Sequence, residues 1–313
     1  MTTRHRTGPA AALAGVTVLA LAIAPTPAPA ASVPPVDPPV RCSSATHPQL
    51  ADRLARDIAT ALTGRRSTLG LAVRDPGADL SCSVAPTRHF DSASIVKTTI
   101  MGAVLRIAQD ENRPLTPFEE ENLRPMITRS DNDAAVRLWT YVGHDRMQAF
   151  LDLAGMHDTV LGESFGLTRA TAGDEMKQLD VYTTNPDVLT PEHKAYGLRL
   201  MAEVEPDQRW GTPFGAPPDV VAHLKNGWLQ RATHAWRVHS LGIFTGPTRL
   251  YQIAVLTDDD PTEAYGIGTI QRIARQVHRD LALAAGDRTT LPQGDPDTTA
   301  PETGDGSVPA ARS

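Results

Sequence analysis

The spacing of apolar residues changes along the chain and predicts where helices and strands lie. Residues 50–62 and 264–283 carry apolar side chains three or four positions apart, which predicts an amphipathic helix in each segment. Short apolar runs bounded by turn residues predict five strands, at residues 68–73, 80–84, 221–229, 236–244 and 250–257. Residues 94–205 have mostly helical patterning, with breaks at prolines.

The order of these elements predicts an α+β fold. A helix and two strands come first, a helical middle follows, and three strands and a long helix come last. Both ends of the domain would then contribute to one antiparallel sheet flanked by helices, with an all-helical subdomain inserted between them. A cleft between two such lobes is a common place for a ligand site.

The two ends of the chain differ in composition from the predicted fold. Arginines at positions 4 and 6, an apolar stretch at residues 10–24 and small residues before position 31 predict a signal peptide over residues 1–30, cleaved near Ala30. Residues 31–47 are predicted to form a Pro-rich linker, residues 48–285 the folded domain and residues 286–313 a disordered tail. We therefore expect a monomer that is secreted or held in the cell envelope, with no stable membrane insertion.

Charge and cysteine content narrow the possible partners. The formal net charge is -6 and no basic run or stripe is present, which argues against nucleic acid as a partner. The two cysteines, Cys42 and Cys82, would pair in an exported protein, and two separate buried thiols are the alternative. No spacing of cysteines and histidines fits a metal site.

The segment Ser94-Ile95-Val96-Lys97 places a hydroxyl and an amine three residues apart. Residues at this spacing share one face of a helix, so Lys97 can take the proton of the Ser94 hydroxyl. A serine is a weak nucleophile until a base stands beside it. The apolar run that follows predicts a buried helix, and burial favours the neutral amine that a base requires.

Two later motifs make this pairing more specific. Ser130-Asp131-Asn132 precedes a helical segment, and Lys225-Asn226-Gly227 begins a strand-like one. In this order the three motifs resemble the signature of class A β-lactamases and penicillin-binding proteins. The resemblance extends from about residue 50 to residue 285. It implies a serine hydrolase that opens β-lactam amides through an acyl-serine intermediate, without a cofactor.

The resemblance also implies roles for individual residues. Ser94 is the expected nucleophile, Lys97 its base, Ser130 the donor of a proton to the departing amine, and Lys225 a positive charge beside Ser130 and the substrate carboxylate. Asp131 is expected to be structural. The expected substrate-binding residues are Asn132, Asn226, Gly227, Trp228 and Arg237. The backbone N–H groups of Ser94 and Trp228 would form the oxyanion hole, and the Trp228 side chain would narrow the rim of the site.

The residue that activates water for deacylation is less clearly marked. Class A enzymes use a glutamate in an E-x-x-x-N loop, and here Glu163 is followed by Leu167 where the asparagine is expected. Glu163 is the candidate base. The departure from the motif favours the alternative function, a D,D-peptidase or penicillin-binding cell-wall hydrolase that acylates but deacylates slowly. The substrate would be a β-lactam or a peptidoglycan peptide.

Two rival interpretations compete with these. Residues 162–166 match the G-x-S-x-G elbow of α/β-hydrolases, but the surrounding pattern lacks the strand and helix that this motif needs. A catalytically silent cell-wall binding module is the rival from a different functional class. Intact motif serines and lysines argue against it.

Overall fold

The computed structural model describes residues 1–3, 39–286 and 294–297 of the chain. The chain divides into two units, Met1–Ser32 and Val33–Ser313. The first unit contributes only residues 1–3 to the description, so the predicted signal peptide and its cleavage near Ala30 lie outside the described residues. The same holds for residues 31–38 of the predicted linker and for most of the predicted tail.

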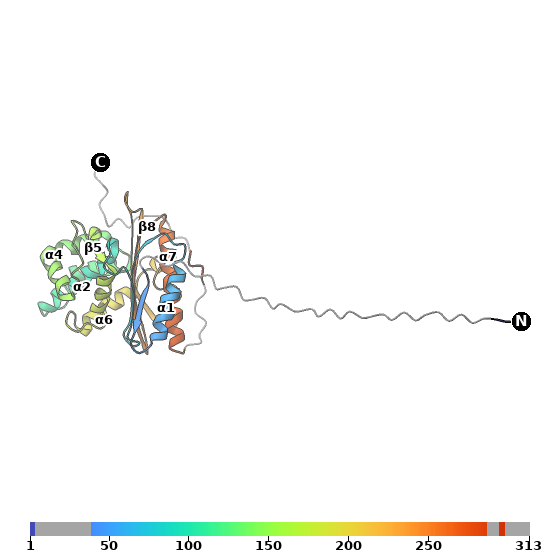
Figure 1. Ribbon diagram of the computed structural model, residues 1–313. Coiled ribbons are helices and arrows are strands. Elements are labelled where there is room, and N and C mark those ends of the chain that lie inside the picture. Colours follow the sequence, from blue (N-terminus) through green and yellow to red (C-terminus); the bar gives the residue numbers. More distant parts are fainter. Residues whose placement is uncertain (4–38, 287–293, 298–313) are drawn as a thin grey trace. The chain divides into compact units, whose positions relative to one another are not determined.

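The second unit is built on a six-stranded antiparallel sheet with the strand order β1-β3-β2-β8-β7-β6 (Figure 1). Strands from the two ends of the unit meet where β2 pairs with β8. A separate two-stranded sheet joins β4 to β5. The strands are β1 (Arg41–Ser44), β2 (Thr68–Asp75), β3 (Leu80–Val84), β4 (His89–Asp91), β5 (Arg169–Thr171), β6 (Val221–Gln230), β7 (Trp236–Gly246) and β8 (Arg249–Asp260).

Helices cover both faces of the large sheet. Figure 1 shows α1 and α7 side by side on one face and the helical subdomain on the other. The α-helices are α1 (Pro48–Ala61), α2 (Lys97–Asp110), α3 (Pro117–Thr128), α4 (Asn132–Ala154), α5 (Ala172–Val181), α6 (Pro191–Ala202) and α7 (Glu263–Ala284). Three short 3-10 helices are η1 (Ala93–Val96), η2 (Phe165–Leu167) and η3 (Pro206–Gln208).

The alternation of side chains between the two faces of the sheet divides the apolar core into two clusters. In β7, Val238 and Phe244 pack with the residues of α1 and α7, whereas Leu241 and Ile243 pack with the helical subdomain. Successive side chains of a strand point to opposite faces, so one strand can serve both clusters. The sheet is therefore buried on both sides. Its strand β6 carries the third motif, Lys225-Asn226-Gly227.

The predicted α+β architecture, with a sheet from both ends of the domain and a helical insertion, is confirmed. The predicted linker is too long, because β1 already pairs with β3 within it. This pairing places Cys42 opposite Cys82, and the two form a disulfide bond, as expected. The predicted tail also contains an ordered contact, since Pro296 is buried.

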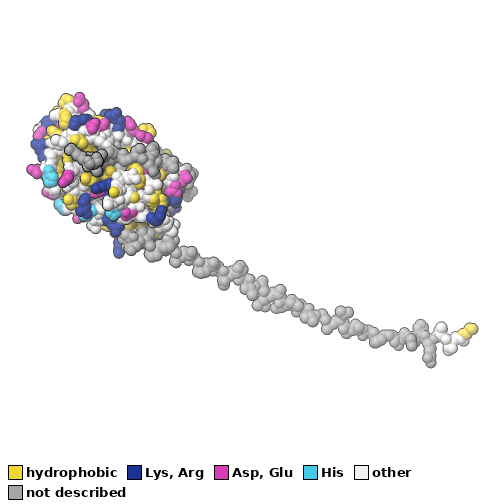
Figure 2. All heavy atoms as spheres, turned by 90° about the horizontal axis from the view of Figure 1, so that it is seen from above, with side chains coloured by type: hydrophobic (Ala, Val, Ile, Leu, Met, Phe, Trp, Pro, Cys, Tyr) yellow, Lys and Arg dark blue, Asp and Glu magenta, His cyan; other side chains and the backbone are white. Residues whose placement is uncertain are grey.

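The surface of the second unit carries charges of both signs. Figure 2 shows Lys and Arg side chains interspersed with Asp and Glu over the face in view. Among the described residues, no helix is long and apolar enough to cross a membrane.

Candidate active site

Ser94 lies on the short helix η1, directly before α2. The turn is tied to the loop that precedes β5, because the Ser92 N–H donates to the Thr168 carbonyl at 2.8 Å. Ala93 has a φ of 46°, a left-handed conformation that side chains other than glycine rarely adopt. Strained backbone of this kind is concentrated at functional sites. Ser94 is fully buried, and within the described ranges its Oγ atom has no hydrogen-bond partner.

Lys97 opens α2 and is also fully buried. Its Nζ atom donates to the Ser130 carbonyl at 2.7 Å, to Ser130 Oγ at 3.0 Å and to Asn132 Oδ1 at 2.6 Å. An ammonium group has three donors, so these bonds can account for all of them. The structure thus brings the first and second motifs together, with the lysine bonded to Ser130 rather than to Ser94.

Ser130 connects the second motif to the third. Its Oγ atom also accepts a hydrogen bond from Lys225 Nζ at 3.0 Å, so one hydroxyl lies between two lysines. Ser130 has a φ of 57°, so it is left-handed like Ala93, which directly precedes the first motif. The two lysines contact this hydroxyl from separate elements, α2 and β6. The arrangement is suited to moving a proton through Ser130.

The start of α4 explains how the second motif is held. Asp131 is the N-cap residue, and its side chain accepts from the Ala134 N–H at 2.8 Å. A capping carboxylate both satisfies a free N–H and complements the helix dipole. The structural role expected for Asp131 is therefore confirmed, and the cap directs the half-buried Asn132 towards Lys97.

Strand β6 places Gly227 directly against the Ser94 turn. A Cβ atom at Gly227 would lie 2.7 Å from the Ser94 nitrogen and 2.9 Å from the Ile95 nitrogen. Both distances are shorter than any real carbon contact, so only glycine permits this approach. Lys225 lies on the same face of β6, since side chains alternate along a strand.

Asn226 and Trp228 lie on the opposite face, which corrects two expectations. Asn226 Nδ2 donates to the carbonyls of Gln208 and Trp210, at 2.7 and 3.0 Å, so it does not present its amide to a substrate. The Trp228 indole packs edge-on against Trp210, with ring centroids 5.6 Å apart, and joins the cluster of α1 and α7. It therefore does not form a rim of the site. The alternation of β6 is the physical reason in both cases.

Arg237 is likewise engaged within the protein, contrary to the substrate contact expected for it. Its Nε atom lies 3.2 Å from Asp91 Oδ2 and 3.5 Å from Asp258 Oδ1, and the side chain is only 4% exposed. Burial raises the pKa of Asp258 to about 7, and the charge of Arg237 opposes that rise. The arginine therefore stabilises a buried acidic cluster next to β4.

The loop between α4 and β5 contributes a further neighbour of Lys97. The loop is closed by a two-way backbone bridge between Val160 and Arg169, at 2.9 and 2.8 Å. Glu163 is exposed on this loop. Phe165 is buried, and its ring centroid lies 5.3 Å from Lys97 Nζ. The structure therefore places an aromatic ring next to the lysine and directs the predicted base to solvent.

Comparison with known protein families identifies the superfamily. A profile of the family described as "Beta-lactamase enzyme family" matches residues 120–281, just over half of the chain. The chain belongs to this β-lactamase enzyme family. The matched region includes Ser130, Asn132 and the Lys225 motif, and it begins after Ser94.

Relatives and solved structures agree with this assignment. Proteins named "Putative lipoprotein LppW", from Mycobacterium tuberculosis and Mycobacterium bovis, are 27% identical over 234 residues, covering 72% of this chain and 73% of theirs. A class A β-lactamase from Bacteroides cellulosilyticus has a TM-score of 0.65 at 19% identity, covering 74% of this chain and 98% of its own. A β-lactamase from Sphaerobacter thermophilus has a TM-score of 0.64 at 22% identity, covering 74% and 97%. The structure of PBP-A has a TM-score of 0.62 at 18% identity, covering 74% and 96%. These likenesses establish the shared fold.

Two residues of this β-lactamase family member were not anticipated from its sequence. Phe165 is one, and its position within an apparent G-x-S-x-G match was the only signal. His239 is the other: its Nε2 atom is 2.8 Å from the Asp91 carbonyl, three residues before Ser94. Burial lowers the pKa of His239 to about 4, so the ring is neutral at physiological pH. No local pattern marked His239, because its position opposite Gly227 depends on the register of β6 and β7.

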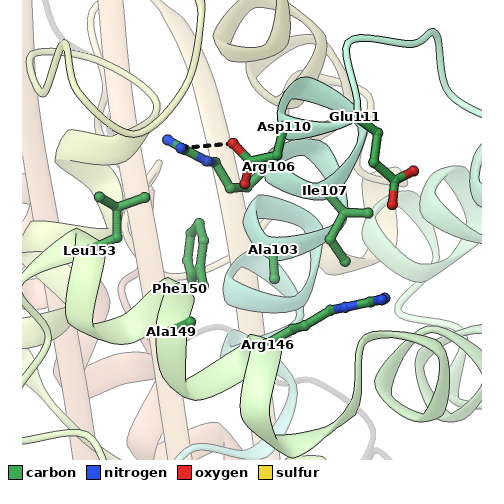
Figure 3. Close-up of a pocket in the computed structure, with 9 residues that line it drawn as sticks. All are labelled: Ala103, Arg106, Ile107, Asp110, Glu111, Arg146, Ala149, Phe150 and Leu153. Atoms are coloured by element: carbon green, nitrogen blue, oxygen red, sulfur yellow. Dashed lines mark ion pairs between the residues drawn. The ribbon is translucent and has the colours of Figure 1, made fainter.

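A hollow elsewhere in the helical subdomain is separate from the motifs. It has a volume of about 260 Å³ between α2 and α4 (Figure 3). Its floor is apolar, with Phe150 between the two helices, and Arg106 pairs with Asp110 at its edge at 2.7 Å. None of the motif side chains lines it. Within the described part of the chain, no group of three or more His, Cys, Asp or Glu residues is arranged to hold a metal ion.

Proposed function

We propose that this protein acylates Ser94 with β-lactams and with peptides ending in D-alanine, and releases the β-lactam-derived acyl group slowly. The observation that carries this proposal is the buried network in which Ser130 Oγ lies 3.0 Å from both Lys97 and Lys225, beside the Ser94 turn. Family membership and fold support a serine hydrolase of the β-lactamase and penicillin-binding type.

In this proposal the network moves one proton during acylation. The neutral form of Lys97 takes the Ser94 proton as Oγ attacks the carbonyl, and the C–N bond of the amide then breaks. Ser130 donates its proton to the departing nitrogen and recovers one from a neighbouring lysine. Gly227 approaches the Ser94 nitrogen closely, and in this proposal the N–H groups of Ser94 and Trp228 would bind the oxyanion.

Deacylation requires a water molecule and a base, and the structure favours a slow step. Glu163 is exposed, while the buried Phe165 ring lies 5.3 Å from Lys97 Nζ. A base must come within about 3 Å of the proton that it removes, either directly or through one water. These positions favour the D,D-peptidase alternative over a fast class A-like β-lactamase. Lys97 would then serve as the base in both steps for the peptide substrate.

We also propose that the protein functions in the cell envelope after export. The related proteins are named lipoproteins, and a disulfide bond is most stable outside the reducing cytosol. Because the Cys42 sulfur is bonded to Cys82, it is not available for a lipid.

The proposal is tested by D-alanine release from an acylated peptide ending in D-Ala-D-Ala. We expect release from this peptide, none from the matched peptide ending in L-Ala, and a block after pre-incubation with one equivalent of benzylpenicillin. Absence of both release and penicillin adduct would overturn the proposal and favour a silent binding module. Turnover of many equivalents of penicillin would overturn it in favour of a β-lactamase.

A further inference from the structure

A short segment near the end of the chain is docked on α7. The Gln271 side chain donates through Nε2 to the Pro296 carbonyl at 2.7 Å, and both residues are buried. Arg272 forms an ion pair with Asp297, and Arg65 lies 3.6 Å from the same carboxylate. The bond from Arg272 holds the pKa of Asp297 below its ordinary value. These contacts come from α7 and from Arg65, and they define a specific binding site for residues 295–297 on the surface of the domain.

The surface of α7 is shaped to receive this segment. A Cβ atom at Gly268 would lie 2.5 Å from Asp297 Oδ1 and 3.2 Å from the Pro296 carbonyl oxygen. Any larger residue at this position would push the segment away from the helix. The Asp295 carboxylate caps this short turn, since its Oδ1 atom accepts a hydrogen bond from the Asp297 N–H at 2.9 Å.

Gln271 links the docked segment to the loop that supports β6. While its amide nitrogen donates to Pro296, its Oε1 atom accepts from the Gly211 N–H at 3.4 Å. Gly211 follows Trp210, whose carbonyl accepts a hydrogen bond from Asn226 at 3.0 Å. Two buried side-chain amides, Gln271 and Asn226, therefore connect the C-terminal segment to the Lys225-Asn226-Gly227 motif through one loop.

We propose that residues 295–297, acting through Gln271 and the loop at residues 208–212, position the Lys225-Asn226-Gly227 strand against the Ser94 turn. The proposal rests on the proposed acylation of Ser94. Asn226 is a positioning residue in this scheme: its amide faces away from Ser94 and fixes the register of the loop beneath the strand. Because Gly227 approaches the Ser94 nitrogen so closely, a small shift of β6 would change the geometry around that nitrogen.

The test compares two truncations of the full chain, one ending at Gln293 and one ending at Asp297. The second retains the docked segment and is the matched control for the first. We expect the chain ending at Gln293 to be acylated by benzylpenicillin about three- to thirtyfold more slowly than the control. We also expect faster hydrogen exchange at residues 208–212 and 225–230. In the full chain, Asp297→Asn should give a smaller change in the same direction, and Asp297→Glu should restore part of the rate.

The two readouts separate failure of this inference from failure of the proposed function. Exchange is measured without any substrate, so it tests the docked segment even if no variant is acylated. Unchanged exchange in the loop and strand would overturn the inference whatever the chemistry of Ser94. Faster exchange with acylation rates within twofold of each other would show that the segment stabilises the loop without positioning the motif, and would also overturn it.

Discussion

The residues that would form the acyl-enzyme and the residues that would face the attacking water are built in different ways. Ser94, Lys97, Ser130 and Lys225 lie where η1, α2, α4 and β6 meet, and all four are buried. The second group lies on the loop between α4 and β5, which is closed by the bridge between Val160 and Arg169. The first group is held by the hydrogen bonds of helices and a strand. In the loop, an aromatic ring can replace a carboxylate without breaking those hydrogen bonds.

This difference separates formation of an acyl-enzyme from its hydrolysis. The acylation group contains the serines and lysines of the three motifs, whereas the loop buries Phe165 and exposes Glu163. An aromatic ring excludes water and provides no proton acceptor of useful basicity. A family fold can therefore retain one half-reaction while its loop alters the other.

The largest expected effect comes from removing the nucleophile. Ser94→Ala should reduce covalent labelling by benzylpenicillin by more than about 1,000-fold, because it removes the proposed nucleophile. Intact-mass spectrometry measures the adduct. Ser92→Ala is the matched control, a buried serine two residues away that should be labelled at a rate within about threefold of the parent rate. Undiminished labelling of the Ser94 variant would remove this residue from the chemistry.

The next effect tests the contact between β6 and the Ser94 turn. Gly227→Val should slow acylation about 100-fold or more, because its Cβ atom would meet the Ser94 nitrogen at 2.7 Å. Stopped-flow acylation kinetics and circular dichroism separate this effect from loss of fold. Gly77→Ala is the control, since its Cβ would meet only the end of the Asp75 side chain, at 3.3 Å. Equal rates for the two variants would contradict the proposed geometry.

A third prediction concerns α5, which follows directly from the loop and β5. Burial and the charge of Asp174 raise the pKa of Glu175 to about 8 from its ordinary value of 4.5. The folded protein therefore holds a proton that the unfolded chain releases, so stability is greatest below pH 4.5 for this group and is lost as the pH rises through 8.

Urea unfolding of the parent and Glu175→Gln at pH 5.5 and 8.5 measures this effect. The parent should lose about 3 kcal/mol more stability than the variant between these two pH values. Parallel pH dependences would show that the Glu175 carboxyl ionises without penalty. The result also measures how much the protonated Glu175 carboxyl in α5 contributes to stability.

The smallest predicted effect changes the loop itself. Phe165→Glu places a carboxylate beside Lys97, and it should shorten the lifetime of the penicillin adduct about tenfold. Phe165→Leu controls for loss of the ring, and Glu163→Gln should leave the lifetime within twofold, because Glu163 is exposed. An adduct stabilised by Glu163→Gln would restore that residue as the deacylation base.

The sequence predicted the elements and the acylation residues because both leave local patterns. Apolar spacing located the strands of the large sheet, apart from β1, and fixed spacings located Ser94, Ser130 and Lys225. The orientations of Asn226 and Trp228 were wrong because the motif was interpreted as a list of residues, although alternation along β6 sends them to the other face. Asp91 lies on β4, whereas Arg237 and Asp258 lie on β7 and β8, so the three meet through tertiary packing that no local pattern encodes.

The roles of Glu163 and Phe165 depended on the path of a short loop. They are two positions apart in the sequence, yet Phe165, which begins η2, is buried and Glu163 is exposed. The docking of residues 295–297 was also missed. The composition of this segment is that of a disordered tail, and its contacts lie on α7 and at Arg65. Both cases require knowledge of which distant surfaces meet.

The central claim, rapid acylation with slow release, is tested most directly by an intact-mass time course with benzylpenicillin while the loss of free drug is followed. We predict an adduct on the peptide that contains Ser94, lasting well beyond its formation, with about one equivalent of drug consumed. Sustained consumption of many equivalents without a lasting adduct would contradict the account and would require a working deacylation base in this site.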